Sequence, residues 1–306
     1  MRPGAWSAQP DRFLVMTGSA DPCILTVHAH PDDESSKGAG TIAKYSDAGV
    51  RSVLVCCTGG EEGDILNPAM DRPEVKENIE AVRREELALA AKIIGYHEVH
   101  YLGYRDSGMP DSEANARPEC FANAPEDEAV ERLVRIIRAE RPQVIVTYPD
   151  DQKGYRHPDH LRVYDITIPA WEAAGDPQRF PDAGDPWTPL KLYYTTWSKA
   201  RIEALHALYG ELDLESPYTE DWFKRPSQDH RITTKVDVQA FYRRRSDALL
   251  AHATQVDPES KFWFGLPQDR AAAAYPYDDY ILAHDRTGAA TPESDVFAGV
   301  PGWAGL

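Results

Sequence analysis

The sequence lacks a long apolar run. No stretch approaches the roughly 18 consecutive apolar residues that a membrane-spanning helix requires. The apolar run near the start, residues 13–16, is shorter than the apolar core of about 7–15 residues in a secretory signal. We therefore expect a cytoplasmic protein, with residues 1–20 as a flexible N-terminal extension.

Positive charge and paired cysteines are also scarce. Lys and Arg number 33 against 50 Asp and Glu, which gives a formal net charge of −17. This charge repels phosphate and anionic headgroups, so it argues against a nucleic-acid partner and against a polybasic membrane-surface protein. None of the 4 cysteines forms a C-x-x-C pair, so buried free thiols are expected rather than a thiolate zinc site.

The first half of the chain alternates short apolar runs with helical patterns. Strands are expected at 24–28, 52–57, 98–102 and 143–148, and helices at 38–48, 74–94, 126–140 and 159–173. Continuous apolar strands that alternate with helices are typical of a parallel sheet covered on both faces. The predicted fold class is therefore α/β, with a first domain over residues 21–174.

The pattern changes after residue 174. Residues 175–189 are rich in Gly, Pro and Asp and indicate a linker or loop. Strands are expected at 190–197 and 279–284 and helices at 199–209 and 236–252, which predicts a smaller C-terminal α+β subdomain, 175–306, beside the substrate pocket. The long irregular stretches 103–125 and 253–278 are candidate functional loops.

Two motifs rich in His and Asp follow the first and the fourth predicted strands. They are HPDDE at 30–34 and HPDH at 157–160. Because the carboxyl ends of parallel strands meet at one sheet edge, we expect the motifs to converge. Two imidazoles and a carboxylate suit Zn²⁺ with positions left for water and substrate, and a bound ion lowers the pKa of water to about 7. A further carboxylate can act as general base, and a His can stabilise an oxyanion.

Each motif alone has a simpler explanation. Asp32, Asp33 or Ser35 can cap the following helix, and His157 can be a loop histidine. The pairing of both motifs at two parallel strand ends favours the metal centre over these readings.

The two motifs resemble the signature of the PIG-L/LmbE-like family of zinc-dependent N-deacetylases and amidases. The resemblance covers most of residues 24–174 and implies a Rossmann-like domain. It implies Asp32 as general base and later acid, His157 as the group that polarises the carbonyl, and Asp159 as the residue that orients His157. The zinc ligands that it implies are His30, Asp33 and His160.

Further segments resemble the mycothiol branch of this family, which contains a deacetylase that makes glucosaminyl-inositol and an amidase that cleaves mycothiol S-conjugates. These segments are TGGEEG at 58–63, RREEL at 83–87, YRDSGM at 104–109 and GYRH at 154–157. The resemblance implies substrate binding by Glu61, Arg83 and Asp106, the last two at sugar and inositol hydroxyls. It matches Tyr155 to a tyrosine that helps to bind the carbonyl. Arg83 has a second explanation as a helix-surface ion pair, and Asp106 as a turn residue.

Lys37 is a further predicted substrate-binding residue and discriminates between the two activities of the branch, because an ammonium on a long side chain near the scissile amide can contact a cysteinyl conjugate but crowds a plain acetyl site. The amidase resembles this chain in carrying Lys there, where the deacetylase has a small residue, although a solvated lysine in a first helical turn is the alternative. The run KFWF at 261–264 belongs either to the core or to a pocket for a bulky hydrophobic substituent on sulfur.

The sequence thus predicts a zinc-dependent amidase that cleaves the amide between glucosaminyl-inositol and the cysteinyl part of mycothiol S-conjugates, a detoxification reaction on a small molecule. The alternatives are a deacetylase of N-acetylglucosaminyl-inositol, an Fe²⁺ facial-triad enzyme, and a non-catalytic sugar-binding module. The ligand set accepts Zn²⁺ and Fe²⁺ alike.

Overall fold

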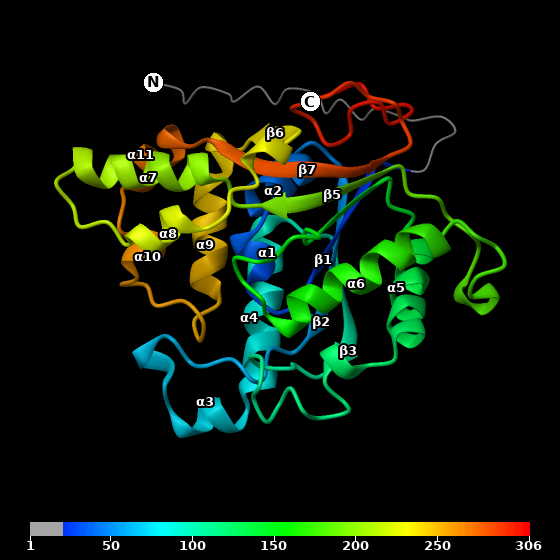
Figure 1. The fold of residues 1–306 in the computed structure, drawn as a ribbon, viewed down its shortest axis with the longest axis horizontal. Coiled ribbons are helices and arrows are strands. Elements are labelled where there is room, and N and C mark those ends of the chain that lie inside the picture. Colours follow the sequence, from blue (N-terminus) through cyan, green and yellow to red (C-terminus); the bar gives the residue numbers. More distant parts are fainter. Residues whose placement is uncertain (1–20) are drawn as a thin grey trace, which may run out of the picture.

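The computed structural model describes residues 21–306 and shows a central twisted sheet with helices on both sides (Figure 1). The N-terminal extension expected over residues 1–20 lies outside the described residues. Within the described part, no helix combines the length and the apolar character needed to span a membrane.

Six of the seven described strands confirm the runs expected from the sequence to within a few residues, whereas β6 overlaps a segment expected to be helical. They are β1 (Cys23–His28), β2 (Arg51–Thr58), β3 (Glu98–Tyr104), β4 (Val144–Thr147), β5 (Lys191–Thr196), β6 (Thr234–Asp237) and β7 (Tyr277–Asp285).

The helices of the first half are α1 (Asp33–Ser36), α2 (Ala39–Asp47), α3 (Pro73–Glu77), α4 (Ile79–Ile94), α5 (Glu126–Glu140) and α6 (Pro158–Ala173). Those of the second half are α7 (Lys199–Glu211), α8 (Glu220–Lys224), α9 (Tyr242–Ala251), α10 (Lys261–Phe264) and α11 (Gln268–Ala274). Short 3₁₀ turns are η1 (Pro68–Met70), η2 (Phe121–Asn123), η3 (Pro181–Ala183), η4 (Asp229–Arg231) and η5 (Gln239–Phe241).

The described strands form one 7-stranded sheet in the order β3-β2-β1-β4-β5-β7-β6. The first five of these run parallel, whereas β7 is antiparallel to both β5 and β6. The sequence predicts a smaller C-terminal α+β subdomain after residue 174, and the strands β5, β7 and β6 of this part extend the sheet of the first half. The sheet is therefore mixed and does not divide at residue 174.

Side chains of alternating direction on the strands build two apolar cores. Leu25 and Val27 of β1 pack with α5 and α6, while Ile24 packs on the other face with α2, α4 and α9. Cys56 and Cys57 follow the same alternation, one in each core, and remain buried free thiols as expected. The covering of both sheet faces is confirmed.

Two predicted helices differ from the structure. The helix expected over 74–94 breaks at Asn78, whose side-chain amide donates to the Glu74 carbonyl at 2.9 Å and competes with the helical pattern. The helix expected over 236–252 begins later than predicted, because its first residues belong to a strand. In that strand Thr234 and Val236 are buried while Lys235 is exposed. This period-2 pattern forms β6 at the sheet edge, and α9 begins at Tyr242.

A third, smaller apolar cluster lies under α7 and α11. Its buried members include Ile202, Leu205 and Tyr209, and Trp222 and Phe262 pack against it while partly exposed. The helices α7, α8, α10 and α11 gather at the end of the molecule toward which β5 points (Figure 1).

Candidate active site

A cavity of about 720 Å³ opens at the carboxyl ends of the parallel strands. Both His/Asp motifs and parts of the two long stretches 103–125 and 253–278 line it, as do residues after β5. The motifs thus converge at one sheet edge, as the topology requires of segments that follow β1 and β4.

His30, Asp33 and His160 bring one ligand atom each into a group whose atoms lie within 4.8 Å of one another. All three residues are buried. The Asp33 Oδ2 atom lies 3.3 Å from His160 Nε2 and 3.5 Å from His30 Nδ1. We call these residues the metal cluster, because two imidazoles and a carboxylate at this spacing fit a divalent ion.

The ring of His30 is held from its other side. Its Nε2 atom lies 3.0 Å from Asp159 Oδ2 and 3.6 Å from Asp106 Oδ1. A proton on Nε2 satisfies these carboxylates and leaves the Nδ1 lone pair facing Asp33, which is the tautomer a metal ligand needs.

Asp159 is the residue that the resemblance assigned to orient His157, and the structure changes that assignment. Its carboxylate accepts from the Ser107 N–H at 3.0 Å and from the Ser107 hydroxyl, and it faces His30. What reaches His157 is the backbone N–H of Asp159, which donates to Nδ1 at 3.2 Å because His157 caps α6. The carboxylate thus positions His30 rather than His157.

The backbone N–H of Asp159 also defines the tautomer of His157. Since Nδ1 accepts, the proton of the neutral ring sits on Nε2. Burial and the neighbouring His30 lower the pKa of His157, which favours the neutral ring. His157 lines the cavity and can therefore donate from Nε2 to a developing oxyanion.

Asp32 adopts an unusual backbone conformation beside the metal cluster. Its φ is 118°, a region that residues with a Cβ rarely occupy and that costs of the order of 1–3 kcal/mol. Its N–H donates to Glu34 Oε2 at 2.9 Å, and Arg83 Nη2 lies 3.1 Å from its Oδ2. These bonds hold the strained residue with its carboxylate in the cavity.

The adjacent carboxylates Asp32 and Asp33 have opposite pKa shifts. Burial raises the pKa of Asp32, although Arg83 opposes this. For Asp33 burial acts the same way, but Lys37 and His160 together hold its pKa well below the usual range. Burial also lowers the pKa of His160 to about 4, so this ring is neutral at pH 7. The raised pKa of Asp32 suits proton transfer, and the lowered pKa of Asp33 suits metal binding.

Lys37, which is expected to contact the cysteinyl group of the substrate, lies beside the metal cluster. Its ammonium donates to Asp33 Oδ1 at 2.5 Å and lies 5.5 Å from the centre of the Tyr148 ring. The Tyr148 ring in turn stacks on His160 at 4.5 Å. Lys37 also lines the cavity, so a substrate contact remains a prediction.

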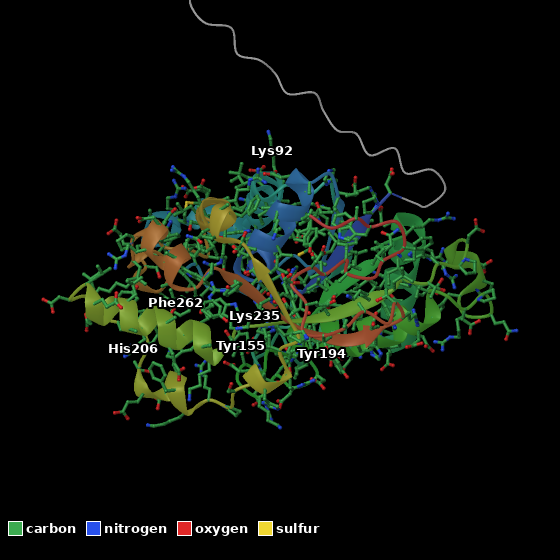
Figure 2. All side chains as sticks on the ribbon, turned by 90° about the horizontal axis from the view of Figure 1, so that it is seen from above. Lys92, Tyr155, Tyr194, His206, Lys235 and Phe262 are labelled. Carbon is green, nitrogen blue, oxygen red and sulfur yellow. The ribbon has the colours of Figure 1, made fainter. Side chains whose placement is uncertain are left out.

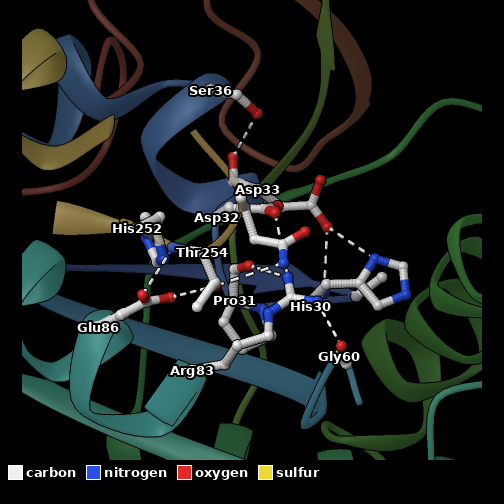
Figure 3. A network of polar contacts seen from close by, with 12 residues as sticks. His30, Pro31, Asp32, Asp33, Ser36, Gly60, Arg83, Glu86, His252 and Thr254 are labelled. Carbon is white, nitrogen blue, oxygen red and sulfur yellow. Dashed lines mark hydrogen bonds and ion pairs between the residues drawn. The ribbon is translucent and has the colours of Figure 1, made fainter. Parts of the chain in front are cut away.

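Three predicted substrate-binding residues line the cavity. Arg83 is buried and donates to the carbonyls of Gly60 and Pro31 (Figure 3). Asp106 accepts from the Gly108 N–H at 2.8 Å. Tyr155 is 55% exposed and lies with its ring centre 5.2 Å from that of His160, at the cavity rim.

Glu61 does not line this cavity. It lies in a separate depression with Arg105, 4.0 Å from that guanidinium, and one carboxylate oxygen is buried without a hydrogen-bond partner. The tight turn at Gly60, with φ 67°, directs Glu61 away and Glu62 toward the cavity. The structure therefore does not support the predicted substrate-binding role of Glu61.

The sequence reasoning missed a buried pair behind Asp32. His252 Nε2 lies 2.7 Å from Glu34 Oε1, and neither side chain is exposed. Burial opposes both charges, but each partner shifts the other, so the pKa of Glu34 is lowered and that of His252 raised. His252 belongs to the network around Asp32, Arg83 and Glu86 (Figure 3). It lies 218 residues from Glu34, and no local motif marks it.

Comparisons with known proteins bear on the same residues. The family model described as GlcNAc-PI de-N-acetylase (PIG-L) matches residues 25–171. A mycothiol S-conjugate amidase from Streptomyces coelicolor is 45% identical over 90% of this chain and 97% of that protein. A 1D-myo-inositol 2-acetamido-2-deoxy-alpha-D-glucopyranoside deacetylase from Streptomyces scabiei is 37% identical over 91% of this chain and 90% of that protein.

Solved structures share the fold at low sequence identity. The N,N'-diacetylchitobiose deacetylase from Pyrococcus horikoshii has a TM-score of 0.57 and 19% identity, covering 85% of this chain and 83% of that chain. The 4-carboxy-2-hydroxymuconate hydratase from Pseudomonas putida has a TM-score of 0.55 and 15% identity, covering 87% and 97%. Because a deacetylase and a hydratase share this fold, the fold alone does not decide the reaction.

Proposed function

The chain belongs to the PIG-L family, and from this premise we propose that it is a zinc-dependent amidase of mycothiol S-conjugates. The reaction cleaves the amide between glucosaminyl-inositol and the cysteinyl part, which releases a free amine and an N-acetylcysteine S-conjugate. Its role is the removal of electrophiles captured on the thiol.

One observation carries the amide-hydrolysis part of this proposal. The metal cluster, the carboxylate of Asp32 and the ring of His157 line the same cavity. Metal ligands, a proton-transfer group and an oxyanion donor are the parts that hydrolysis of an amide needs. A sugar-binding module has no need of a carboxylate that is held beside the metal cluster in a strained backbone conformation, as that of Asp32 is.

The proposed metal ligands are His30, Asp33 and His160. When bound, the ion supplies Lewis acidity, which polarises the amide carbonyl and makes water a better nucleophile. Fe²⁺ accepts the same ligands, and we favour Zn²⁺ because the proposed hydrolysis needs Lewis acidity and no change of oxidation state.

The chain's own residues supply the proton chemistry. Asp32 takes a proton from the attacking water and then delivers it to the leaving amine nitrogen, and its raised pKa suits both directions. His157 donates from Nε2 to the carbonyl oxygen as negative charge develops there. Arg83 and Asp106 bind hydroxyls of the amine half of the substrate from their places in the cavity wall.

Deacetylation is a second possible activity, because relatives named as deacetylases are 37% identical over most of this chain. Lys37 and the size of the cavity favour the conjugate, since an acetyl group needs little space beyond the scissile carbonyl. Deacetylation of N-acetylglucosaminyl-inositol is therefore the alternative function.

The fold supports one further part of the proposal. The parallel strands follow the order β3-β2-β1-β4-β5, which is that of doubly wound sheets, so residues 21–174 with β5 form a Rossmann-like unit. Residues 175–306 extend this sheet and wall the cavity. The cytoplasmic location and the absence of a nucleic-acid partner stay predictions.

The test is an assay of the purified chain, stripped of metal and reloaded with Zn²⁺ or Fe²⁺, on a mycothiol S-conjugate and on N-acetylglucosaminyl-inositol. We expect the larger kcat/KM on the conjugate and release of one free amine per acid. A preference for the acetyl substrate by orders of magnitude would make the chain a deacetylase. Hydrolysis of neither substrate would contradict both assignments.

A further inference from the structure

The strand order distributes three kinds of side chain along the edge of the sheet. The acidic residues Glu62 and Asp106 follow β2 and β3, the metal cluster follows β1 and β4, and Trp197 follows β5. Because the order is β3-β2-β1-β4-β5, the metal cluster lies between the polar end and the β5 end of one cavity. An amide at the metal therefore has its amine half on one side and its acyl half on the other.

Four aromatic side chains from three separate elements line the β5 end of the cavity. We call Trp197, Trp222, Phe262 and Trp263 the aromatic wall. Each is partly exposed, although large aromatic side chains of this kind are usually covered. Phe262 and Tyr155, which both line the cavity, lie on the same side of the molecule (Figure 2).

The rings of the aromatic wall hold one another in place. Phe262 stacks on Trp197 at 5.8 Å with 13° between the planes and on Trp222 at 5.5 Å with 29°. Trp263 meets Phe262 edge to face at 4.7 Å. A wall that is already assembled loses little side-chain entropy when a ligand covers it, which favours binding.

A hydrogen bond connects the aromatic wall to the metal cluster. Trp197 Nε1 donates to the Ser36 carbonyl at 3.3 Å, and the next residue, Lys37, pairs with Asp33. Neighbouring strands lie about 4.8 Å apart, so the end of β5 is roughly 5–10 Å from the ends of β4 and β1. The sulfur of a cysteinyl amide lies three bonds, roughly 4 Å, from the scissile carbonyl, so a substituent on this sulfur can reach the wall.

The chemistry of the wall favours a flat apolar group over a second sugar. Indole and phenyl faces offer stacking area but few acceptors for hydroxyls, which the polar end supplies instead. The Arg225 guanidinium lies 4.0 Å from the Trp222 ring, which adds a cation beside the aromatic surface. Electron-rich aromatic substituents can contact both the rings and this cation.

We propose that the aromatic wall is the subsite for the group carried on the substrate's sulfur and that it selects flat, apolar, aromatic substituents. The assignment rests on the proposed function, since it needs an acyl half that bears such a group. It makes Trp222 and Phe262 determinants of specificity, at a distance from the residues that perform the hydrolysis.

The experiment compares two mycothiol conjugates, one with a flat bicyclic aromatic group and one with a methyl group on sulfur. We measure the ratio of their kcat/KM values in the wild type, Trp222→Leu, Phe262→Leu and the conservative Trp222→Phe. We expect the ratio to fall about ten- to a hundredfold in the two leucine variants and to recover largely in Trp222→Phe. The matched control is Trp187→Leu, a partly exposed tryptophan that does not line the cavity and whose loss should leave the ratio unchanged.

A binding measurement covers the case in which a variant loses activity for other reasons. The acid product with the aromatic group should inhibit the wild type at least about tenfold better than it inhibits Phe262→Leu. The amine product, glucosaminyl-inositol, should inhibit both to a similar degree. Loss of inhibition by the amine product alone would assign the wall to the sugar and overturn the proposal. An unchanged ratio in both leucine variants would overturn it as well, whereas a wild type inactive on every conjugate contradicts the proposed function instead.

Discussion

The metal cluster and the aromatic wall share a cavity but are built in different ways. Around the metal cluster each side chain has directed partners, such as His30 with Asp159 at 3.0 Å and Asp33 with Lys37 at 2.5 Å. In the aromatic wall the contacts are ring against ring, and Trp197 contributes one hydrogen bond to the Ser36 carbonyl. Hydrogen bonds and ion pairs hold individual atoms in the positions that catalysis needs, whereas stacked rings form a surface that can bind a group of the substrate.

The largest expected effect comes from Asp33→Ala, which removes the carboxylate at the centre of the metal cluster. We expect kcat/KM to fall about 10⁴-fold or more, because the variant loses the ion and its Lewis acidity. Metal analysis after dialysis checks the cause. Full metal content together with near-normal activity would contradict the ligand assignment.

Asp32→Asn separates proton transfer from metal binding. We expect kcat to fall about 10²- to 10³-fold with metal content unchanged, since the amide accepts no proton. In the wild type Asp32 works as a base when ionised, so activity falls as the pH drops through its pKa. Because burial raises this pKa, the loss begins at a higher pH than for an ordinary aspartate with pKa 3.8. The acid limb of the pH profile should disappear in Asp32→Asn.

His252→Ala tests the buried pair of His252 and Glu34 behind Asp32. It leaves Glu34 without its cationic partner, and we expect the free energy of unfolding to fall by about 3 kcal/mol. Glu34 also holds the N–H of strained Asp32, so kcat should fall further than stability alone explains. Chemical denaturation and kinetics check both parts. The matched control is His206→Ala, an exposed histidine whose loss should change stability by less than about 0.5 kcal/mol.

Trp197→Phe gives the smallest expected effect and tests the boundary between the two regions. The variant keeps an aromatic ring in the wall but loses the bond to the Ser36 carbonyl. We expect a loss of about 1 kcal/mol in the free energy of unfolding and a small change in substrate preference. A loss of metal would instead mean that the wall positions helix α1, which carries Asp33.

The sequence predicts the metal cluster better than its surroundings for a physical reason. HPDDE follows the buried strand β1 almost directly and HPDH follows the buried strand β4 after a short loop, so local pattern and parallel topology are enough to bring them together. Glu34 and His252 lie 218 residues apart, and their contact depends on how α9 packs against the first half. Such a pair leaves no local pattern.

The remaining differences between the sequence prediction and the structure come from a turn and from strand pairing, which the sequence pattern does not specify. Glu61 and Glu62 are chemically alike, and the turn at Gly60 decides which of them faces the cavity. Val236 fits both a helix and a strand pattern, and pairing with β7 decides for the strand. The strands after residue 174 were not expected in the same sheet, because a sequence pattern does not say which strands become neighbours.

The sheet order has a consequence for how this protein can diversify. Since different strands carry different parts of the cavity, exchange of α8 and α10 replaces most of one recognition surface while β1, β4 and the buried His252–Glu34 pair stay in place. Specificity for the acyl half of the substrate can therefore change independently of the residues that perform the hydrolysis.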